Sequence, residues 1–73
     1  MQIQITNKIE QKVNEYQEQT GATKTWIAKQ IGISPARMYQ IFKTNNMMID
    51  VYIRFAILLD CTLEDLVEYN KII

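Results

Sequence analysis

The segment TKTWIAKQIGISPARMYQIFK, residues 23–43, decides the fold of this chain. Its spacing is typical of two short helices joined by a tight turn. Ala28 is small where the first helix must approach the second, and Gly32 tolerates the positive φ that a tight turn requires. Ser34 and Pro35 suit the N-cap and the first position of the second helix. The segment therefore predicts a helix-turn-helix. The apolar residues expected to hold its two helices at a fixed angle are Ile27, Ile31, Ile33, Met38 and Ile41.

The regions on either side of this segment also show helical spacing. Asn7 and Glu10 resemble a capping box before the first helix, and Gly21 supplies its stop. Thr62 and Asp65 form a capping pair before the last helix. Because the chain has only two glycines and one proline, we expect an all-α fold, a compact bundle of five short helices with the helix-turn-helix in the second and third. The expected helices cover about 7–20, 24–31, 35–42, 49–59 and the residues after 62.

The two ends of the chain carry weaker patterns. Residues 1–6 alternate polar and apolar side chains, which fits a short strand, a disordered segment or a helical lead-in. Apolar residues from Leu63 to Tyr69 are expected on one side of the last helix, which leaves residues 70–73 as a short tail. We therefore expect a single domain over residues 1–73, with no internal repeat or linker.

Composition argues against several classes of function. The chain has one cysteine, Cys61, and no histidine, so it offers neither an internal disulfide nor a cysteine–histidine catalytic pair. It has no metal-ligand cluster and no glycine-rich phosphate loop, so we expect no enzymatic activity, metal or cofactor. The apolar run at residues 56–59 is too short to cross a bilayer, and the N-terminus lacks the pattern of a signal peptide. We expect a cytoplasmic protein without membrane association.

Charge is distributed unevenly along the chain, although the formal net charge is zero. Residues 19–49 contain four cations and no anions, whereas residues 50–73 contain two cations and five anions. Residues 1–18 contain two cations and three anions. Positive charge is therefore confined largely to the segment that carries the helix-turn-helix. A basic face on an acidic body is typical of small DNA-binding domains, and chance variation in a short chain is the alternative.

Five helices with the turn motif in the second and third resemble the phage Cro and repressor type of helix-turn-helix domain, the XRE family. The resemblance covers about residues 9–69. It rests on the turn motif with the preceding Gly-Ala-Thr of residues 21–23, on Met38 and Ile41, and on LLDCTLEDL at residues 58–66. The last stretch is similar to the closing segment of the family, and an unrelated helix-turn-helix would not share it. The chain departs from the family at three positions. It has Lys24, Phe42 and Asp60 where the family often has Gln, Glu and Gly, respectively.

The resemblance implies how the chain would bind double-stranded DNA. In this geometry the helix over residues 35–42 lies in the major groove and its exposed side chains meet base edges. Arg37 can pair with guanine and Gln40 with adenine, each through two hydrogen bonds. The candidate base contacts are Pro35, Ala36, Arg37, Tyr39 and Gln40. The candidate phosphate contacts are Lys24 and Thr25 before the turn, and Lys43, Thr44, Asn45 and Asn46 after the recognition helix.

These features favour a sequence-specific transcriptional regulator of the phage or mobile-element type, which represses by occupying a pseudo-palindromic operator. The four cations of residues 19–49 are few for DNA binding, and a homodimer would double them. The alternation at residues 1–5 is one candidate dimer surface. The other consists of apolar residues that exceed the needs of a small core, namely Leu66, Tyr69, Ile72 and Ile73.

Two other functions stay open at this point. A net charge of zero, Trp26 and the apolar tail would suit a protein-interaction module, such as an antirepressor or a phage regulatory factor that binds another regulator. An architectural factor in recombination or excision would use the same DNA-binding face without repressing transcription. Retention on non-specific DNA, with release as salt rises, would distinguish a DNA-binding protein from an interaction module.

Overall fold

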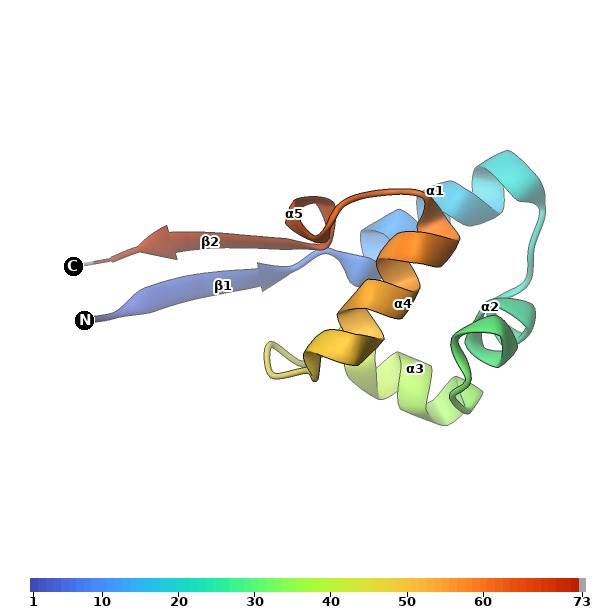
Figure 1. The fold of residues 1–73 in the computed structure, drawn as a ribbon, viewed down its shortest axis with the longest axis horizontal. Helices are drawn as coiled ribbons and strands as arrows, with labels where there is room; N and C mark the ends of the chain where they lie inside the picture. Colours follow the sequence, from blue (N-terminus) through green and yellow to red (C-terminus); the bar gives the residue numbers. More distant parts are fainter. Residues whose placement is uncertain (73) are drawn as a thin grey trace.

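The computed structural model describes residues 1–72 as a bundle of five helices from which a two-stranded ribbon projects (Figure 1). The expected all-α bundle is confirmed, and the small sheet is an addition to it. The bounds of α2, α3 and α4 agree with those expected from the sequence. In chain order the elements are β1 (Ile3–Asn7), α1 (Ile9–Thr20), α2 (Lys24–Ile31), α3 (Pro35–Phe42), α4 (Ile49–Leu59), α5 (Leu63–Leu66) and β2 (Val67–Lys71).

The structure corrects the expectation for the C-terminal end of the chain and decides among the alternatives for the N-terminal end. The last helix stops at Leu66, and the chain then continues as β2 rather than as helix and tail. β2 pairs antiparallel with β1, with Ile3 opposite Lys71 near the tip, so the N-terminal lead-in is a strand. β-branched and aromatic residues such as Val67 and Tyr69 favour a strand once a partner is available. That partner lies at the other end of the chain, so the spacing of residues within a short window cannot indicate it.

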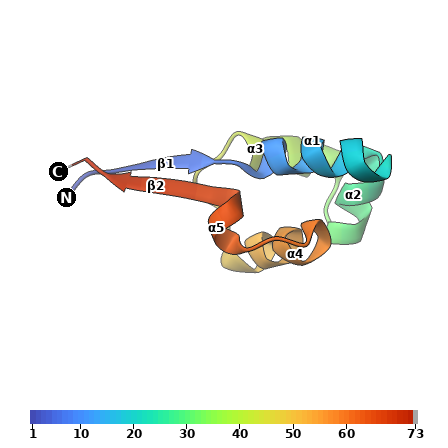
Figure 2. The ribbon, with the colours of Figure 1, turned by 90° about the horizontal axis from the view of Figure 1, so that it is seen from above.

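The ribbon gives the molecule its length, and its principal extents are 41 × 22 × 17 Å. It leaves one end of the bundle, with the N-terminus at its free tip (Figure 1). Within the bundle, α1 and α3 lie in one layer and α4 and α5 in another, while α2 closes the far end (Figure 2). Over residues 1–72, no helix combines the length and the apolar character needed to span a bilayer.

The core lies where the helices meet. Of the apolar residues expected to join α2 and α3, all are buried except Ile33, which is half-buried against the core. Leu66, expected at a dimer interface, is fully buried within its own chain, so that expectation is wrong. The buried residues are Ile9, Val13, Ile27, Ala28, Ile31, Met38, Ile41, Phe42, Phe55, Ala56 and Leu66.

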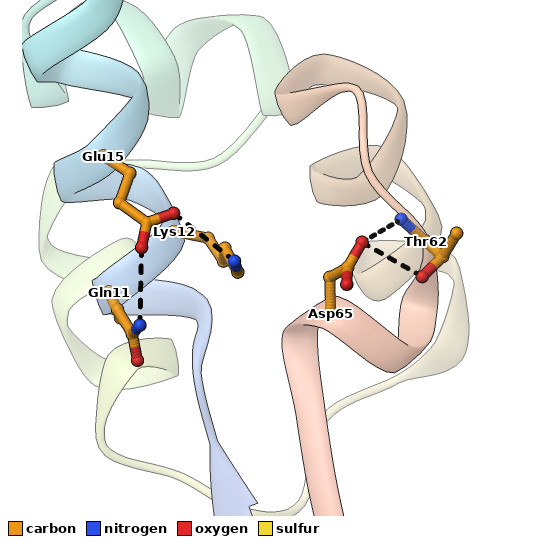
Figure 3. Close-up of polar contacts among 5 residues, drawn as sticks. All are labelled: Gln11, Lys12, Glu15, Thr62 and Asp65. Atoms are coloured by element: carbon orange, nitrogen blue, oxygen red, sulfur yellow. Dashed lines mark hydrogen bonds and ion pairs between the residues drawn. The ribbon is translucent and has the colours of Figure 1, made fainter.

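Most helix ends carry the signals expected of them. Gly21 and Gly32 adopt left-handed conformations with φ of 76° and 90°. Among residues 1–72, Asp60 is the one non-glycine residue with positive φ, at 54°, where it ends α4. At the start of α5, the Thr62 backbone N–H and hydroxyl donate to the Asp65 carboxylate at 3.0 and 3.1 Å (Figure 3). These donors lower the pKa of Asp65 below its ordinary value of 3.8.

Candidate nucleic-acid interface

The turn between α2 and α3 is built from local hydrogen bonds. The Thr23 hydroxyl accepts from the backbone N–H of Trp26 at 3.0 Å, which caps the start of α2. The N–H of Gly32 donates to the carbonyl of Ala28 at 2.9 Å and ends that helix. The Ser34 hydroxyl accepts from the N–H of Arg37 at 3.1 Å and caps α3. The cap expected at Ser34 is therefore confirmed, and it fixes where α3 begins.

One face of α3 is free of the core. All the residues expected to contact bases are exposed, whereas the other side of the helix is buried in the bundle. Arg37 Nη1 donates to Gln40 Oε1 at 3.4 Å, so these two side chains lie together on the exposed face. The contact is long and solvent-exposed, and base edges could replace it. The exposed residues on this face are Pro35, Ala36, Arg37, Tyr39 and Gln40.

Tyr39 combines packing with exposure. Its ring meets the ring of Phe42 edge to face, with centroids 5.8 Å apart and an interplanar angle of 87°. Phe42 is nearly buried, while Tyr39 keeps 49% of its surface exposed. The neighbouring ring therefore restrains Tyr39 and leaves part of it available to a ligand. Trp26, on the first turn of α2, is also partly exposed, at 43%.

The two candidate phosphate contacts at the start of α2, Lys24 and Thr25, differ in how exposed their side chains are. Thr25 is exposed at the N-terminus of α2, where unpaired backbone N–H groups favour anions. Lys24 is half-buried, and its ammonium donates to Gln17 Oε1 at 2.6 Å. The Gln17 amide also donates to the carbonyl of Ala22 at 3.1 Å. Gln17 thus ties Lys24 to the turn between α1 and α2, a role that the sequence did not reveal.

The loop after α3 carries the remaining candidate phosphate contacts. Lys43, Asn45 and Asn46 are exposed, while Thr44 is half-buried. The Thr44 hydroxyl accepts from the N–H of Asn46 at 3.1 Å, so the loop has internal order. The loop therefore presents one cation and two amides beside the C-terminus of α3.

Asn7 anchors this loop from the end of β1. Its amide donates to the carbonyl of Ile41 at 2.7 Å and to that of Thr44 at 2.6 Å. Its side-chain oxygen accepts from the N–H of Ile9 at 3.0 Å. The residue that begins α1 as N-cap is Lys8, so the expected pairing of Asn7 with Glu10 in a capping box is wrong. A residue 34 positions before Ile41 in the chain holds the end of α3, and no local pattern could have indicated it.

The electrostatic arrangement leaves positive charge available around α2 and α3. The two ion pairs found within residues 1–72 lie on α1 and α4, and neither involves a cation from residues 19–49. Lys12 pairs with Glu15 at 3.4 Å (Figure 3), and Arg54 pairs with Asp50 at the same distance. Arg54 also donates to the carbonyl of Ile31 at 3.3 Å, which places a cation at the C-terminus of α2.

A cavity of about 200 Å³ lies elsewhere, between α1 and the end of α4. Cys61 lines it, and burial together with the nearby Asp65 and Asp60 carboxylates raises the pKa of its thiol. A raised pKa lowers thiolate reactivity, so this wall offers no activated nucleophile. Within residues 1–72, no three side chains of the metal-binding types come together as a group.

Comparison with known protein families gives a match to the Cro/C1-type HTH DNA-binding domain over residues 12–71. The match includes α2, the turn, α3 and the following loop, and it continues through α4 and α5 into β2. Neither the curated proteins nor the solved structures gave a match.

Proposed function

The chain belongs to the Cro/C1-type helix-turn-helix DNA-binding domains, and from this membership we propose that it is a sequence-specific repressor of the phage or mobile-element type. It acts in the cytoplasm, where α3 enters the major groove of a pseudo-palindromic operator that a homodimer occupies. The observation that carries the proposal is the exposed Arg37–Gln40 pair on the helix that this family places in the groove.

Base recognition rests on the middle of α3. Arg37 pairs with guanine O6 and N7, and Gln40 pairs with adenine N6 and N7. Pro35 and Ala36, at the start of the helix, offer apolar contact to a thymine methyl group. Tyr39 adds a ring that Phe42 restrains. Because the helix tip is apolar, sequence preference should also depend on DNA shape.

Phosphate contacts flank this face on both sides. Thr25 and Lys24 bind one strand at the N-terminus of α2, where Gln17 holds the lysine. The segment 43–46 binds the opposite side of the groove, supported by Asn7. Four cations in residues 19–49 of each chain become eight in a dimer, which is enough for a steep dependence on salt.

We place the proposed dimer surface on exposed residues of the ribbon, and not on the candidate residue that lies in the core. Tyr69 and Ile72 are 72% and 53% exposed, so they keep their place as candidate interface residues. Leu66 is buried and is removed from that set. Ile73 lies outside the described residues.

Selection of DNA sequences on the purified chain tests the proposal. Wild-type protein should enrich a short inverted repeat from fragmented genomic DNA. The double variant Arg37→Ala/Gln40→Ala loses two bidentate contacts of about 1–3 kcal/mol each, so its discrimination should fall by roughly 30-fold or more. Gln11→Ala/Lys12→Ala on α1 removes the same kinds of group and should enrich the same repeat. If the folded Arg37/Gln40 variant enriches the repeat normally, α3 is not the reading helix.

A protein-interaction module is the second candidate, because α4 exposes apolar side chains away from the proposed DNA face. Ile49, Ile53 and Ile57 recur every fourth residue along α4, and all are exposed. This candidate predicts that the folded chain passes through a DNA column at low salt and enriches no sequence. Retention followed by release as salt rises would instead support DNA binding.

A further inference from the structure

The ribbon leaves the bundle with two free edges, and the edges differ in charge. A free strand edge pairs readily with another chain unless charge, proline or a covering segment protects it. Residues 1–7, which contain β1, have neither a charged side chain nor a proline, whereas β2 carries Glu68 and Lys71. A two-stranded ribbon alone is marginally stable in water, and added strands stabilise it. The β1 edge is therefore the better candidate for pairing.

The hydrogen bonds between β1 and β2 show which backbone groups face outward. The N–H of Lys8 donates to the carbonyl of Leu66, and the N–H of Ile72 donates to that of Gln2, both at 2.9 Å. In an antiparallel pair such bonds occur at alternate residues, so the even-numbered residues of β1 bond to β2. Ile3 and Ile5 therefore turn their N–H and carbonyl groups toward the free edge. The β1 edge thus offers two donors and two acceptors in the alternation that a new strand requires.

We propose that β1 pairs antiparallel, edge to edge, with β1 of a second copy of this chain, so that two ribbons form one four-stranded sheet. The two-fold axis passes between the two copies of Gln4, and Ile3 of each chain exchanges both hydrogen bonds with Ile5 of the other. The isoleucines of both chains then lie in cross-strand contact on one face. A register centred on Ile5 would instead set each Ile3 opposite the polar Asn7, so that only the two copies of Ile5 would form a direct isoleucine pair across the interface.

This pairing rests on the proposed function, which requires both α3 helices of the dimer to face the same DNA duplex, and the pairing meets that requirement. Asn7 lies on the same face of β1 as Ile3 and Ile5, because alternate strand residues share a face. Its amide reaches the carbonyls at the end of α3, so α3 lies on that side of the sheet. A two-fold axis perpendicular to the sheet keeps both α3 helices on one side, where one DNA duplex can meet both. If the two ribbons packed face to face instead, the two α3 helices would lie opposed to each other rather than side by side on one face of the dimer.

Matched proline substitutions on the two edges test the pairing. Proline at position 3 removes an outward N–H and spares the bonds between β1 and β2. Lys71 lies directly opposite Ile3, so Lys71→Pro makes the same change on the other edge. By sedimentation equilibrium, Ile3→Pro should weaken the dimer about 10- to 100-fold, because two of four intermolecular hydrogen bonds are lost. Lys71→Pro should leave the dissociation constant unchanged, with circular dichroism confirming that both variants fold.

A cysteine pair tests the register independently. In a Cys61→Ala background, Gln4→Cys places two thiols across the axis at a non-hydrogen-bonded pair, where Cα atoms are about 4.5 Å apart and a disulfide fits. Mild oxidation should link this variant into a covalent dimer. Thr6→Cys lies two residues from the axis in each chain and should stay unlinked. Linking of Thr6→Cys without linking of Gln4→Cys would overturn the register.

Three further outcomes would overturn the inference. The first is a folded Ile3→Pro variant that dimerises like the wild type. The second is a dimer that survives Ile3→Pro but dissociates with Ile53→Glu, which would place the interface on α4. The third is a wild-type chain that stays monomeric both alone and on DNA. If such a monomer still enriched a single half-site sequence, the β1 pairing would fail while DNA recognition by α3 would stand.

Discussion

Replacing Asn7 by alanine should loosen the loop after α3 and destabilise the domain. In the structure the Asn7 amide donates to the carbonyls of Ile41 and Thr44 at 2.7 and 2.6 Å, and its oxygen accepts from the N–H of Ile9 at 3.0 Å. The side chain is half-buried, so water can replace these contacts only in part. Alanine removes all three while leaving the backbone of β1 able to pair.

The expected loss follows from the hydrogen bonds. Each contributes about 0.5–1.5 kcal/mol net, and leaving a partly buried carbonyl without its donor adds to that loss. We expect the free energy of unfolding to fall by about 2–3 kcal/mol, with the Ile9 N–H contributing least because water can reach a helix N-terminus. For a domain of this size, about 1 kcal/mol corresponds to roughly 4–8 °C, so the melting temperature should drop by roughly 10–20 °C.

Urea and thermal unfolding followed by circular dichroism measure this effect. Asn14→Ala is the matched control, because Asn14 is exposed on α1 and alanine favours helices there. At a temperature where both variants are folded, Asn7→Ala should also bind DNA more weakly, since the loop over residues 43–46 is no longer held. If Asn7→Ala unfolds with the same free energy as Asn14→Ala, the bonds to the end of α3 do not anchor the loop.

Two further predictions concern the end of α4 and the start of α5. Asp60 has φ of 54° and ψ of 52°, a left-handed conformation that costs a residue with a Cβ roughly 1–2 kcal/mol. Asp60→Gly removes this cost, although glycine makes the unfolded chain more flexible. The melting temperature measured by thermal unfolding should therefore rise by a few degrees, and a lower melting temperature would contradict the reasoning. The pKa of Asp65 is lowered, chiefly by the Thr62 N–H and then by its hydroxyl. The carboxylate therefore stabilises the fold above about pH 4, and this contribution disappears as the pH falls through the lowered pKa. Asp65→Asn should reduce the loss of stability that urea titrations show as the pH falls below about 4, and an unchanged acid dependence would exclude this cap as its source.

Local signals were enough to predict the helices that carry the recognition face. Thr23, Gly32 and Ser34 act within one turn of their own positions, so their spacing fixes where α2 ends and α3 begins. The exposed face of α3 follows directly, because burial of Met38 and Ile41 turns the intervening residues outward. These parts of the fold depend on contacts that a short window of sequence contains.

The parts that were missed depend on contacts between distant residues. Local spacing predicts helix at the start of β2, because the partner strand that makes it a strand lies at the other end of the chain. The sequence predicts that Leu66 is surplus to the core, yet Leu66 is fully buried where α5 ends and β2 begins. The role of Asn7 is a contact across 34 and 37 positions. No sequence period marks such pairings, so they emerge only from the assembled structure.

The strand proposed to join two copies also supports the surface proposed to bind DNA. Asn7 ends β1 and anchors the loop after α3, while Ile3 and Ile5 on the same strand offer the free edge. In a monomer the ribbon has only its own two strands, so β1 can fray and release the loop. Pairing with a second copy would hold β1 in place and order the loop at the same time. By thermodynamic linkage, DNA should then tighten the dimer by the same factor by which dimerisation tightens DNA binding. Asn7→Ala should weaken that coupling more than it weakens the dimer itself, and measuring dimer dissociation with and without operator DNA would show whether it does.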